Sequence, residues 1–458
     1  MSVPRIDQLL GIEVYATKTT GIGGLIRESV EDFVVEEVLV DGSKAEIEKS
    51  VARQVLGAST CRQRYLLCVL VKRNWDTFVA LRNIAKQLGL SQGQIHIAGI
   101  KDAKAVTAQH ITVENCSMGD TTNVNVKDIE IRPVGYVHEK LSPYYLLGNN
   151  FTIRIKAIKR SESTLEKQIT ETAEALDAVG GIPNFFGHQR FGTTRPITHL
   201  VGKAIVEGDF EKAAMLYLAK PSVHEHPSSR NARAELRSTR DFKQALNNFP
   251  KQLRFERLML SYLVEKPDDF VGAFMRLPVK LQALFVQAYQ SYLFNRFLSE
   301  RIKNGFSLNK AEVGDYLVNV ERSGLPMVNV AKVAGVETVM DANELVKARR
   351  MRVALPLIGI KQRLSKGAMG HIEQQIIEEE GIKTENFKVN AISQISGRGG
   401  LRTVLAPVQS FKLHVTSDFT SNQRKHQADL SFMLLRGSYA TVFLREIMKP
   451  TNPIAAGF

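Results

Sequence analysis

The sequence GIKDAKAVTAQ, at residues 99–109, sets a single carboxylate, Asp102, among lysine and glutamine side chains. It overlaps the apolar run IHIAGI at 95–100 and precedes HITV at 110–113, and both runs are typical of strands. We therefore predict that residues 101–109 form a polar loop between two strands, and such loops often carry functional side chains. By itself, an aspartate in a basic loop is more often a turn former, so a role for Asp102 needs support from the rest of the chain.

The chain around this stretch is predicted to mix strands and helices. Predicted strands, rich in valine and leucine or alternating in polarity, cover 33–38, 64–71 and 429–436. Predicted helices, with apolar residues at helical spacing, cover 76–89, 161–179, 281–303 and a segment beginning near Tyr439. Breaks in the pattern near residues 182 and 388 indicate a domain inserted between two halves of another.

The composition indicates a globular protein with a polyanion as partner. The chain has 458 residues, of which 44% are hydrophobic, and this length suits about two or three domains. Lysine and arginine number 61 against 47 acidic residues, so the net charge is +14 and the sequence pI is about 9.5. Nucleic acid is the usual polyanion that such an excess attracts.

The sequence carries no pattern typical of a membrane span, a secretion signal or a metal site. Apolar runs stay short of the ~18 residues of a membrane helix, and residues 1–25 lack a signal-peptide pattern. We therefore expect a cytoplasmic protein with no membrane partner. The three cysteines include no Cys-x-x-Cys pair, and His224 and His226 have no second pair of ligands nearby, so we expect no metal and no cofactor.

A run of acidic residues offers a different chemistry, that of a magnesium-dependent nuclease. The acids are Glu31, Asp32, Glu36 and Glu37. They lie in or beside a predicted strand, where alternate side chains point to opposite faces. That arrangement makes a poor metal cluster, so we rank the nuclease hypothesis low.

Residues 99–109 also match a known pattern. GIKDAKAVTAQ resembles the signature Gly-x-Lys-Asp-x-x-Ala-x-Thr-x-Gln of the TruD family of tRNA pseudouridine synthases, and Asp102 occupies the position of the family's catalytic aspartate. Other segments are similar to family motifs in the same order, namely GGLIRESVEDFVVEEV (23–38), LLGNNF (146–151), GIPNFFGHQRFG (181–192), AYQSYLFNRFLSERI (288–302) and GSYATVFLREIMK (437–449). The resemblance covers nearly the whole chain, although residues 200–280 match only loosely.

This resemblance implies a fold. We expect an α+β protein whose catalytic domain, made of residues 1–182 and 388–458, has a mostly antiparallel curved sheet with flanking helices. Residues 183–387 are expected to form an inserted α/β domain of the TRUD type, of a length that resembles archaeal and eukaryotic members. The two domains would form the walls of an RNA cleft. A single chain would be sufficient for this, so we expect a monomer.

The resemblance also implies a reaction and a substrate. Family members break the C1′–N1 bond of a uridine, turn the uracil and form a C1′–C5 bond, without metal or cofactor. The implied substrate is tRNA, and the implied target is U13 in the D arm. The competing hypothesis is a non-catalytic RNA-binding or tRNA-folding protein, in which Asp102 would be replaceable.

Three residues, Arg27, Lys101 and Gln109, are expected to act in the site around Asp102. Arg27 is the preferred ionic partner, because a guanidinium stays charged when buried and can grip a carboxylate with two bonds. A surface phosphate contact is the alternative role for Arg27. Lys101 and Gln109 flank Asp102 in the signature and are expected substrate-binding residues. Lys101, as a direct neighbour in extended chain, should nevertheless point to the opposite face from Asp102.

Two residues of the Gly-Asn-x-Phe motif are expected to meet the target base. A uridine must leave its stack to reach a carboxylate, at a cost of a few kcal/mol. By the motif match, Phe151 would stack on that base and return ~1–3 kcal/mol. Asn149 would hold backbone or base edges nearby. Without the motif, a phenylalanine that opens the alternating strand FTIRI would more often be a core residue.

Arginines of the insert are candidates for binding the RNA backbone. The residues Arg230, Arg233, Arg237 and Arg240 recur at three- and four-residue steps, so a helix there would show them on one face. That face would suit phosphates, or it would simply be a solvated charged surface. Further candidates are Arg190, Arg195, Arg349, Arg350, Arg352, Arg398 and Arg402. The segment 189–192, QRFG, could instead lock the insert onto the catalytic domain.

Overall fold

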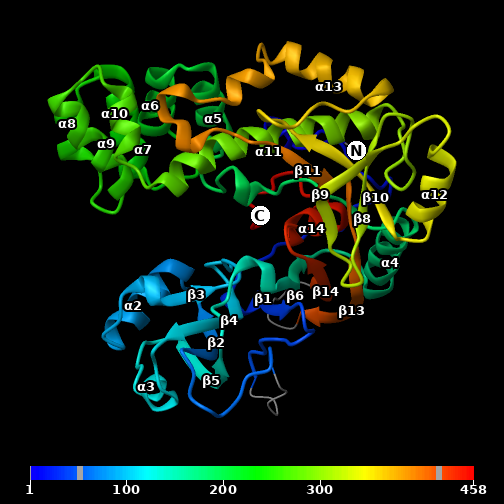
Figure 1. The fold of residues 1–458 in the computed structure, drawn as a ribbon, viewed down its shortest axis with the longest axis horizontal. Helices are drawn as coiled ribbons and strands as arrows, with labels where there is room; N and C mark the ends of the chain where they lie inside the picture. Colours follow the sequence, from blue (N-terminus) through cyan, green and yellow to red (C-terminus); the bar gives the residue numbers. More distant parts are fainter. Residues whose placement is uncertain (1, 49–54, 419–424) are drawn as a thin grey trace.

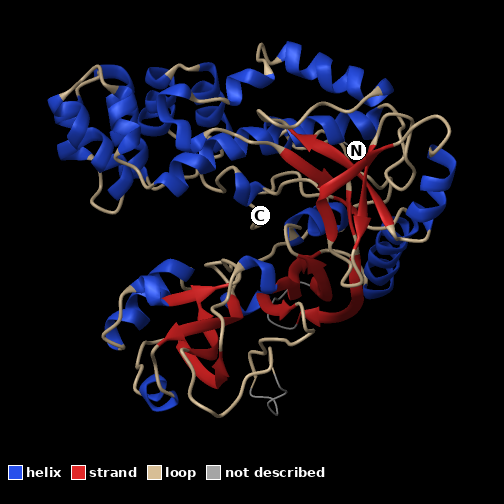
Figure 2. Cartoon of the chain, viewed as in Figure 1, coloured by secondary structure: helices blue, strands red, loops and turns tan. Residues whose placement is uncertain are grey.

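The structure, a computed structural model, describes residues 2–48, 55–418 and 425–458, and its largest sheet lies in the lobe that carries residues 99–109 (Figures 1 and 2). The strand order is β13-β14-β6-β1-β4-β2-β5, with β3 paired to β4. The strands are β1 (Phe33–Leu39), β2 (Tyr65–Arg73), β3 (Ile95–Ile97), β4 (Val106–Glu114), β5 (Ile129–Val137), β6 (Leu146–Ile158), β13 (Val408–Asp418) and β14 (Lys425–Leu435). β1 and β4 run parallel, and the other neighbouring pairs run antiparallel. The expected α+β fold with a mostly antiparallel sheet is confirmed.

Five helices belong to this lobe or connect it to the rest of the chain. They are α1 (Arg5–Leu9), α2 (Thr77–Gln87), α3 (Met118–Thr122), α4 (Glu162–Ala178) and α14 (Ala440–Met448). α4 packs against β13 and against α14. Leu81, Ile84 and Ala85 of α2 are buried in the same apolar cluster as Leu66 and Cys68 of β2. Helices α2 and α4 therefore pack against the sheet and stabilise the lobe that carries residues 99–109.

The helices predicted over 76–89 and 161–179 are confirmed as α2 and α4, and each begins at a capping side chain. Asp76 accepts a hydrogen bond from the Val79 amide at the start of α2, and Ser161 does the same for Thr164 at the start of α4. Such side-chain caps satisfy amides that the first helical turn leaves without a partner. The helix expected near Tyr439 is α14.

The expected loop at 101–109 is shorter than predicted. β4 begins at Val106, so Thr107 and Gln109 lie inside a strand and are fully buried. β4 is central in the sheet, between β1 and β2, and it is therefore buried along nearly its whole length. The polar character of Thr107 and Gln109 led to the prediction that they are exposed, but the sheet encloses both side chains.

The second lobe is formed by the insert and is mainly helical (Figure 2). Its helices are α5 (Thr198–Glu207), α6 (Phe210–Ala219), α7 (Pro227–Thr239), α8 (Phe242–Asn248), α9 (Arg254–Glu265), α10 (Phe270–Met275), α11 (Val279–Lys303), α12 (Val339–Lys347) and α13 (Gly367–Glu379). A four-stranded sheet has the order β11-β10-β8-β9, from β8 (Tyr316–Val320), β9 (Pro326–Val333), β10 (Met351–Leu357) and β11 (Gly400–Thr403). β11 lies after residue 388, the expected end of the insert, so this sheet includes a strand from beyond the expected boundary.

Two further strands join the lobes. β7 (Ile182–Pro183) pairs with β12 (Leu405–Ala406) at the two points where the chain passes between the lobes. The long helix α11, which matches the helix predicted over 281–303, has Phe285, Tyr289 and Phe294 buried in the main core. In Figure 1 the α2–α3 end of the sheet lobe and the helices α7–α10 lie at the far ends of the two lobes, and the C-terminus lies between the lobes.

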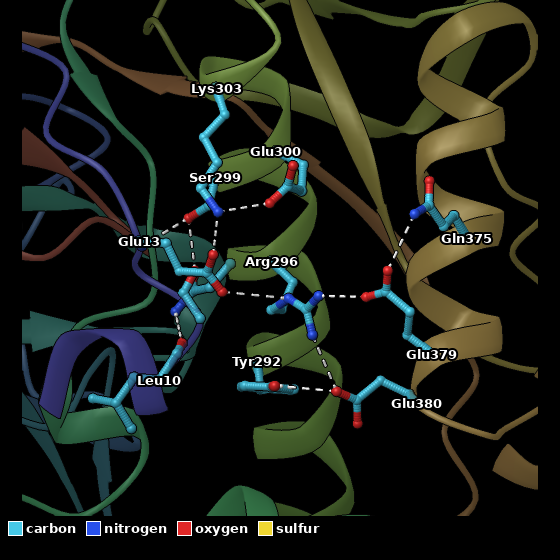
Figure 3. A network of polar contacts seen from close by, with 12 residues as sticks. Leu10, Glu13, Tyr292, Arg296, Ser299, Glu300, Lys303, Gln375, Glu379 and Glu380 are labelled. Atoms are coloured by element: carbon cyan, nitrogen blue, oxygen red, sulfur yellow. Dashed lines mark hydrogen bonds and ion pairs between the residues drawn. The ribbon is translucent and has the colours of Figure 1, made fainter. Parts of the chain in front are cut away.

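A polar network fixes α11 between the N-terminal segment and α13 (Figure 3). The Arg296 guanidinium lies 2.8 Å from Glu379, 3.3 Å from Glu380 and 3.5 Å from Glu13. Tyr292 on the same helix donates a hydrogen bond to Glu380. Three segments distant in sequence are thus connected through one arginine, which supports the position of the insert's long helix.

Among the helices of the described residues, none is both long and apolar enough to cross a bilayer.

Candidate active site

The loop between β3 and β4 carries Asp102, and two buried side chains hold its backbone. Lys72, at the end of β2, donates hydrogen bonds from Nζ to the carbonyls of Asp102 (2.7 Å) and Trp75 (2.8 Å). Thr77, at the start of α2, binds both main-chain groups of Lys101, its Oγ1 donating to the carbonyl at 3.1 Å and accepting from the amide at 3.2 Å. The backbone at 101–102 is therefore fixed from both neighbouring elements.

Lys72 is buried with neutral acceptors around its ammonium. Burial lowers its pKa to about 8, and the negative charge of Asp102 acts in the opposite direction. The ammonium is therefore attracted to the carboxylate while its hydrogen bonds go to backbone carbonyls. This double interaction makes Lys72 a positioning residue for Asp102.

Asp102 itself faces outward and forms an ion pair with Arg27. The carboxylate Oδ1 lies 2.8 Å from Arg27 Nη2, and the Asp102 side chain is 31% exposed. Arg27 is buried, with its guanidinium 4.0 Å from the centre of the Phe33 ring, and it also donates to the carbonyl of Gly457. Burial lowers the pKa of Arg27, and the charge of Asp102 opposes that shift. The predicted pairing is present, through one hydrogen bond rather than two.

The backbone of Arg27 is strained. Its φ is 58°, in the left-handed region that side chains with a Cβ rarely adopt. Main-chain hydrogen bonds of the two preceding residues help to hold this geometry, because Leu25 pairs with Lys156 and the Ile26 amide donates to the Ala456 carbonyl. Strain of this kind persists where the surroundings over-determine it, and it often marks functional sites.

Lys101 points away from the Asp102 carboxylate, as expected for adjacent residues. Its Nζ lies 2.6 Å from Glu37 Oε2 and donates to Asn149 Oδ1 at 2.7 Å. Glu37 also accepts from the amide of His110. Burial tends to raise the pKa of Glu37, but the charge of Lys101 and the hydrogen bonding of His110 hold that pKa below its usual range. Lys101 and Asn149 thus belong to a buried polar network beneath the loop.

Two expected substrate contacts lie in the interior instead. Gln109 is fully buried and donates to the Gly99 carbonyl, so it supports the loop and does not reach solvent. Phe151 is 6% exposed, stacks on Phe432 and meets Phe33 edge-on. The expected free aromatic face of Phe151 is therefore absent here, because that ring packs against two others. Its position instead supports Phe33, the ring that carries the Arg27 guanidinium.

Comparisons with known proteins show the family of this chain. Residues 9–447 match the family model described as tRNA pseudouridine synthase D (TruD). The chain belongs to the TruD family. It is 40% identical over 449 residues to the "Probable tRNA pseudouridine synthase D" of Methanosarcina barkeri, with 98% of each chain covered. It is 36% identical over 436 residues to the protein of the same name from Pyrococcus abyssi, with 95% of this chain and 98% of the relative covered.

A solved structure of the TruD family has the same architecture. The crystal structure of a Methanosarcina mazei protein that carries the name tRNA pseudouridine synthase D (TruD) superposes with a TM-score of 0.82 at 38% identity. The match covers 99% of this chain and all of the other. The likeness therefore includes the insert as well as the sheet lobe with Asp102.

Three of the four acids considered for a nuclease have a basic partner of their own. Glu36 lies 2.6 Å from Lys44, and Asp32 lies 2.7 Å from Lys156, whereas Glu37 pairs with Lys101. Within the described ranges, no three His, Cys, Asp or Glu side chains come together as a metal site would require. These acids therefore act as ion-pair partners within the TruD fold.

The arginines of α7 do not form one exposed face. Arg233 is buried, with Nη2 2.7 Å from Glu256 and Nε 3.0 Å from Glu225, so its charge is used inside the lobe. Arg230 is half-buried, and Arg237 and Arg240 are exposed. Arg240, beyond the helix end, pairs with Glu211. Arg233 therefore does not lie on the exposed helix face that was predicted to bind phosphates, and it is no longer a candidate RNA-binding residue.

Arg190 and Arg402 lie together near the junction of the lobes. Arg402 donates to the carbonyls of Asn184 and Gly437, and Arg190 donates to the hydroxyl of Ser291. Gln189 accepts a hydrogen bond from Thr441 of α14. The QRFG segment therefore contacts the catalytic lobe, as the second interpretation of this motif predicted.

Sequence reasoning missed several residues that shape the site. Lys72, Thr77 and His110 were not singled out, and Glu37 was considered only as a metal ligand. Lys72 was the one with a signal in the sequence. It lies near the end of the apolar strand YLLCVLVKR, and a lysine that is buried there must find hydrogen-bond acceptors inside the fold. Phe33 carried no signal that distinguishes it from a core residue.

Proposed function

We propose that this chain converts uridine 13 in the D arm of tRNA into pseudouridine, with Asp102 as the reacting carboxylate. Membership of the TruD family supports the reaction class. The observation that carries the residue assignment is the ion pair between the partly exposed Asp102 and the buried Arg27. We also propose that one chain is sufficient, with the catalytic domain and the insert forming a single substrate-binding surface.

The reaction needs one carboxylate and no net oxidation or hydrolysis. The C1′–N1 bond of uridine breaks, the uracil turns within the site, and the C1′–C5 bond forms. The proton at C5 is then lost, and N1 gains one, so atoms and charge balance. Asp102 would serve either by attacking C1′ or by removing a proton from the sugar. Both routes need an ionised carboxylate that is held still.

The chain's own residues meet that requirement in three ways. Arg27 sets a positive charge against the carboxylate, and a cation within hydrogen-bond distance favours the ionised form of an acid. Lys72 and Thr77 fix the backbone that carries it. Because these supports are buried while Asp102 is partly exposed, the carboxylate is presented to a substrate on a rigid base.

Tritium release from tRNA labelled at uridine C5 tests the proposal, since the new bond forms at C5 and must expel that label. We expect wild type to release label in EDTA and Asp102→Asn to lose more than about 1000-fold in rate. Glu31→Gln, an exposed carboxylate just before β1, is the matched control and should keep wild-type activity. Carbodiimide mapping of the product should place the modification at U13.

Other outcomes would reject parts of the proposal. Label release by Asp102→Asn at the wild-type rate would remove Asp102 as the reacting group. No release by wild type from a tRNA that it binds would favour the RNA-binding or tRNA-folding hypothesis. Release at another uridine would keep the synthase assignment and reject U13.

A further inference from the structure

A cavity of about 510 Å³ lies between α11, the turn at His188–Arg190 and the loop at 394–399. Its charged lining residues are three arginines, Arg190, Arg398 and Arg402, and no aspartate or glutamate lines it. Gln287 and Gln290 of α11 add amide groups. The cavity is thus a polar hollow with one sign of charge, apart from the site at Asp102.

The two inner arginines of this cavity are satisfied only by neutral groups. Arg402 donates to Asn184 at 2.6 and 2.8 Å and to the Gly437 carbonyl at 2.8 Å. Arg190 donates to Ser291 at 3.1 Å and Gln287 at 3.3 Å. Over the part of the chain that the structure describes, neither arginine has an ion pair with a carboxylate. Two guanidiniums therefore share this corner without a counter-charge.

Burial and the mutual repulsion of Arg190 and Arg402 make two charged guanidiniums in this cavity unfavourable. Burial lowers the pKa of Arg402 to about 10; the electrostatic influence of Tyr439 opposes this shift, and the nearby positive charge of Arg190 adds to it. Arginines that are buried more deeply in the insert have acids, for example Arg301 with Asp315 and Arg233 with Glu256. Arg190 and Arg402 are half-buried, and a partly desolvated cation gains from an anion that a ligand supplies. The cavity therefore has the charge of an anion site.

Aromatic rings hold the two guanidiniums in place before any ligand arrives. The Arg402 guanidinium lies 4.0 Å from the centre of the Phe186 ring and 5.9 Å from that of Tyr439. Arg190 lies 5.8 Å from Phe186. Planar guanidiniums fixed in this way match the oxygens of a phosphate and lose little freedom on binding. Because Phe186 is itself 8% exposed, it offers no free face to a base.

The cavity is connected to the candidate active site through β14. Arg402 binds the carbonyl of Gly437, which lies two residues beyond the end of that strand. Leu434 of β14 pairs with Asn149, the residue that binds Lys101 beside Asp102. The cavity and the candidate active site therefore both adjoin β14.

We propose that this cavity binds a backbone phosphate of the substrate RNA, near the target uridine, through Arg190 and Arg402. The proposal rests on the proposed function for the identity of the RNA. It adds a second anchoring point, on the insert side, to the carboxylate site on the sheet lobe. The chemistry recognised is a phosphodiester and not a base, so the contact carries no sequence preference.

Equilibrium binding of tRNA to the full chain at several NaCl concentrations tests this site. Arg190→Gln should weaken binding about 10-fold, the loss expected for a hydrogen bond to a charged group. It should also reduce the slope of log K against log salt by about 0.7 to 0.9, the value for one phosphate contact. Arg190→Lys should keep most of the slope. Lys167→Gln, which removes an exposed charge on α4 that pairs with Glu171, should leave both quantities unchanged.

The outcomes separate this proposal from the proposed function, because binding is measured without turnover. An unchanged salt slope in Arg190→Gln would overturn the proposal, and so would an equal loss in Lys167→Gln. Inorganic phosphate alone provides the other arm. If it raises the melting temperature of wild type but not of Arg190→Gln while tRNA binding is unaffected by the substitution, the cavity is a free-anion site and the RNA contact is rejected.

Discussion

At the scale of single residues, the sequence identified which residues lie in or beside the site better than it predicted whether each of them is buried or exposed. Asp102 and Arg27 were predicted as a pair, and their ion pair is present at 2.8 Å. Gln109 and Phe151 were predicted to meet substrate, yet both lie inside the protein. A sequence motif contains residues that contact substrate and residues that hold the site in shape, and it does not tell them apart. The packing of β4 and of the Phe33, Phe151 and Phe432 rings shows that Gln109 and Phe151 belong to the second kind.

Arg27 provides the sharpest prediction at this scale. Arg27→Gln removes the charge that faces Asp102 while leaving a polar side chain of similar length. We expect the rate of pseudouridine formation to fall by about 100-fold, the scale of one well-placed electrostatic group. Arg27→Lys should recover a large part of that loss, because an ammonium can also reach the carboxylate. Single-turnover tritium release at saturating tRNA measures both.

The controls for Arg27 distinguish charge at the site from charge elsewhere. Arg73→Gln removes an exposed arginine at the end of β2 and should leave the rate unchanged. Arg27 also has a left-handed φ, so the folded fraction of each variant should be checked by circular dichroism. An Arg27→Gln enzyme that is folded and as fast as wild type would show that the ion pair plays no part in the reaction.

At the scale of elements, the helices and the strands β1, β2 and β14 were predictable, whereas the start of the buried strand β4 was not. α2 and α4 carry a cap residue and an apolar stripe that can be identified in a sequence. β4 is enclosed on both faces, and its polar residues find partners on other elements, such as the Gly99 carbonyl for Gln109. The local sequence pattern around β4 does not indicate these hydrogen-bond partners. The expected loop was therefore too long by the residues that belong to β4.

Helix α13 carries a buried acid whose protonation should be visible in stability. Glu373 is fully buried and accepts hydrogen bonds from the amide and hydroxyl of Ser365, both at 2.7 Å. Burial raises its pKa to about 8, and the nearby negative charge of Asp315 adds to that shift. Between an unfolded value of 4.5 and about 8, the folded chain holds a proton that the unfolded chain has lost. Stability should therefore fall as the pH rises through this window.

Glu373→Gln should remove that pH dependence, because its side chain does not ionise. Urea unfolding at pH 5 and pH 8 measures the effect. At pH 8 the variant should be more stable than wild type by on the order of 3 kcal/mol, and at pH 5 the two should be similar. Glu378→Gln, an exposed acid on the same helix, should follow wild type at both values. Parallel curves for wild type and Glu373→Gln would place the ionisation outside this window.

At the scale of the whole molecule, the sequence indicated an insertion but not how the parts are joined. The breaks near 182 and 388 lie close to β7 and β11, yet β11 completes the insert's sheet from the far side of the expected boundary. Contacts between distant segments decide the arrangement. Asp7 of α1 is the clearest case, since it binds His188 of the turn that enters the insert and Arg445 of α14.

Asp7 supports the whole molecule because one buried carboxylate connects both lobes. Burial would raise its pKa, but hydrogen bonding to His188 and the charge of Arg445 hold that pKa below its usual range. The stabilisation from this ionised group is thus present above an unfolded value of 3.8 and is lost as the pH falls through the lower folded value. Neutral pH is therefore where its removal should cost most.

Asp7→Asn leaves Arg445 buried beside a neutral partner, and such a change typically costs about 3–5 kcal/mol. We expect a lower midpoint in urea unfolding at pH 7, and weaker tRNA binding because the insert and the sheet lobe are held less firmly. Asp268→Asn, an exposed aspartate before α10, should change neither. If Asp7→Asn unfolds at the same urea concentration as wild type, then the lobes are joined mainly by apolar packing around α11, and the buried ion pairs specify the geometry without adding net stability.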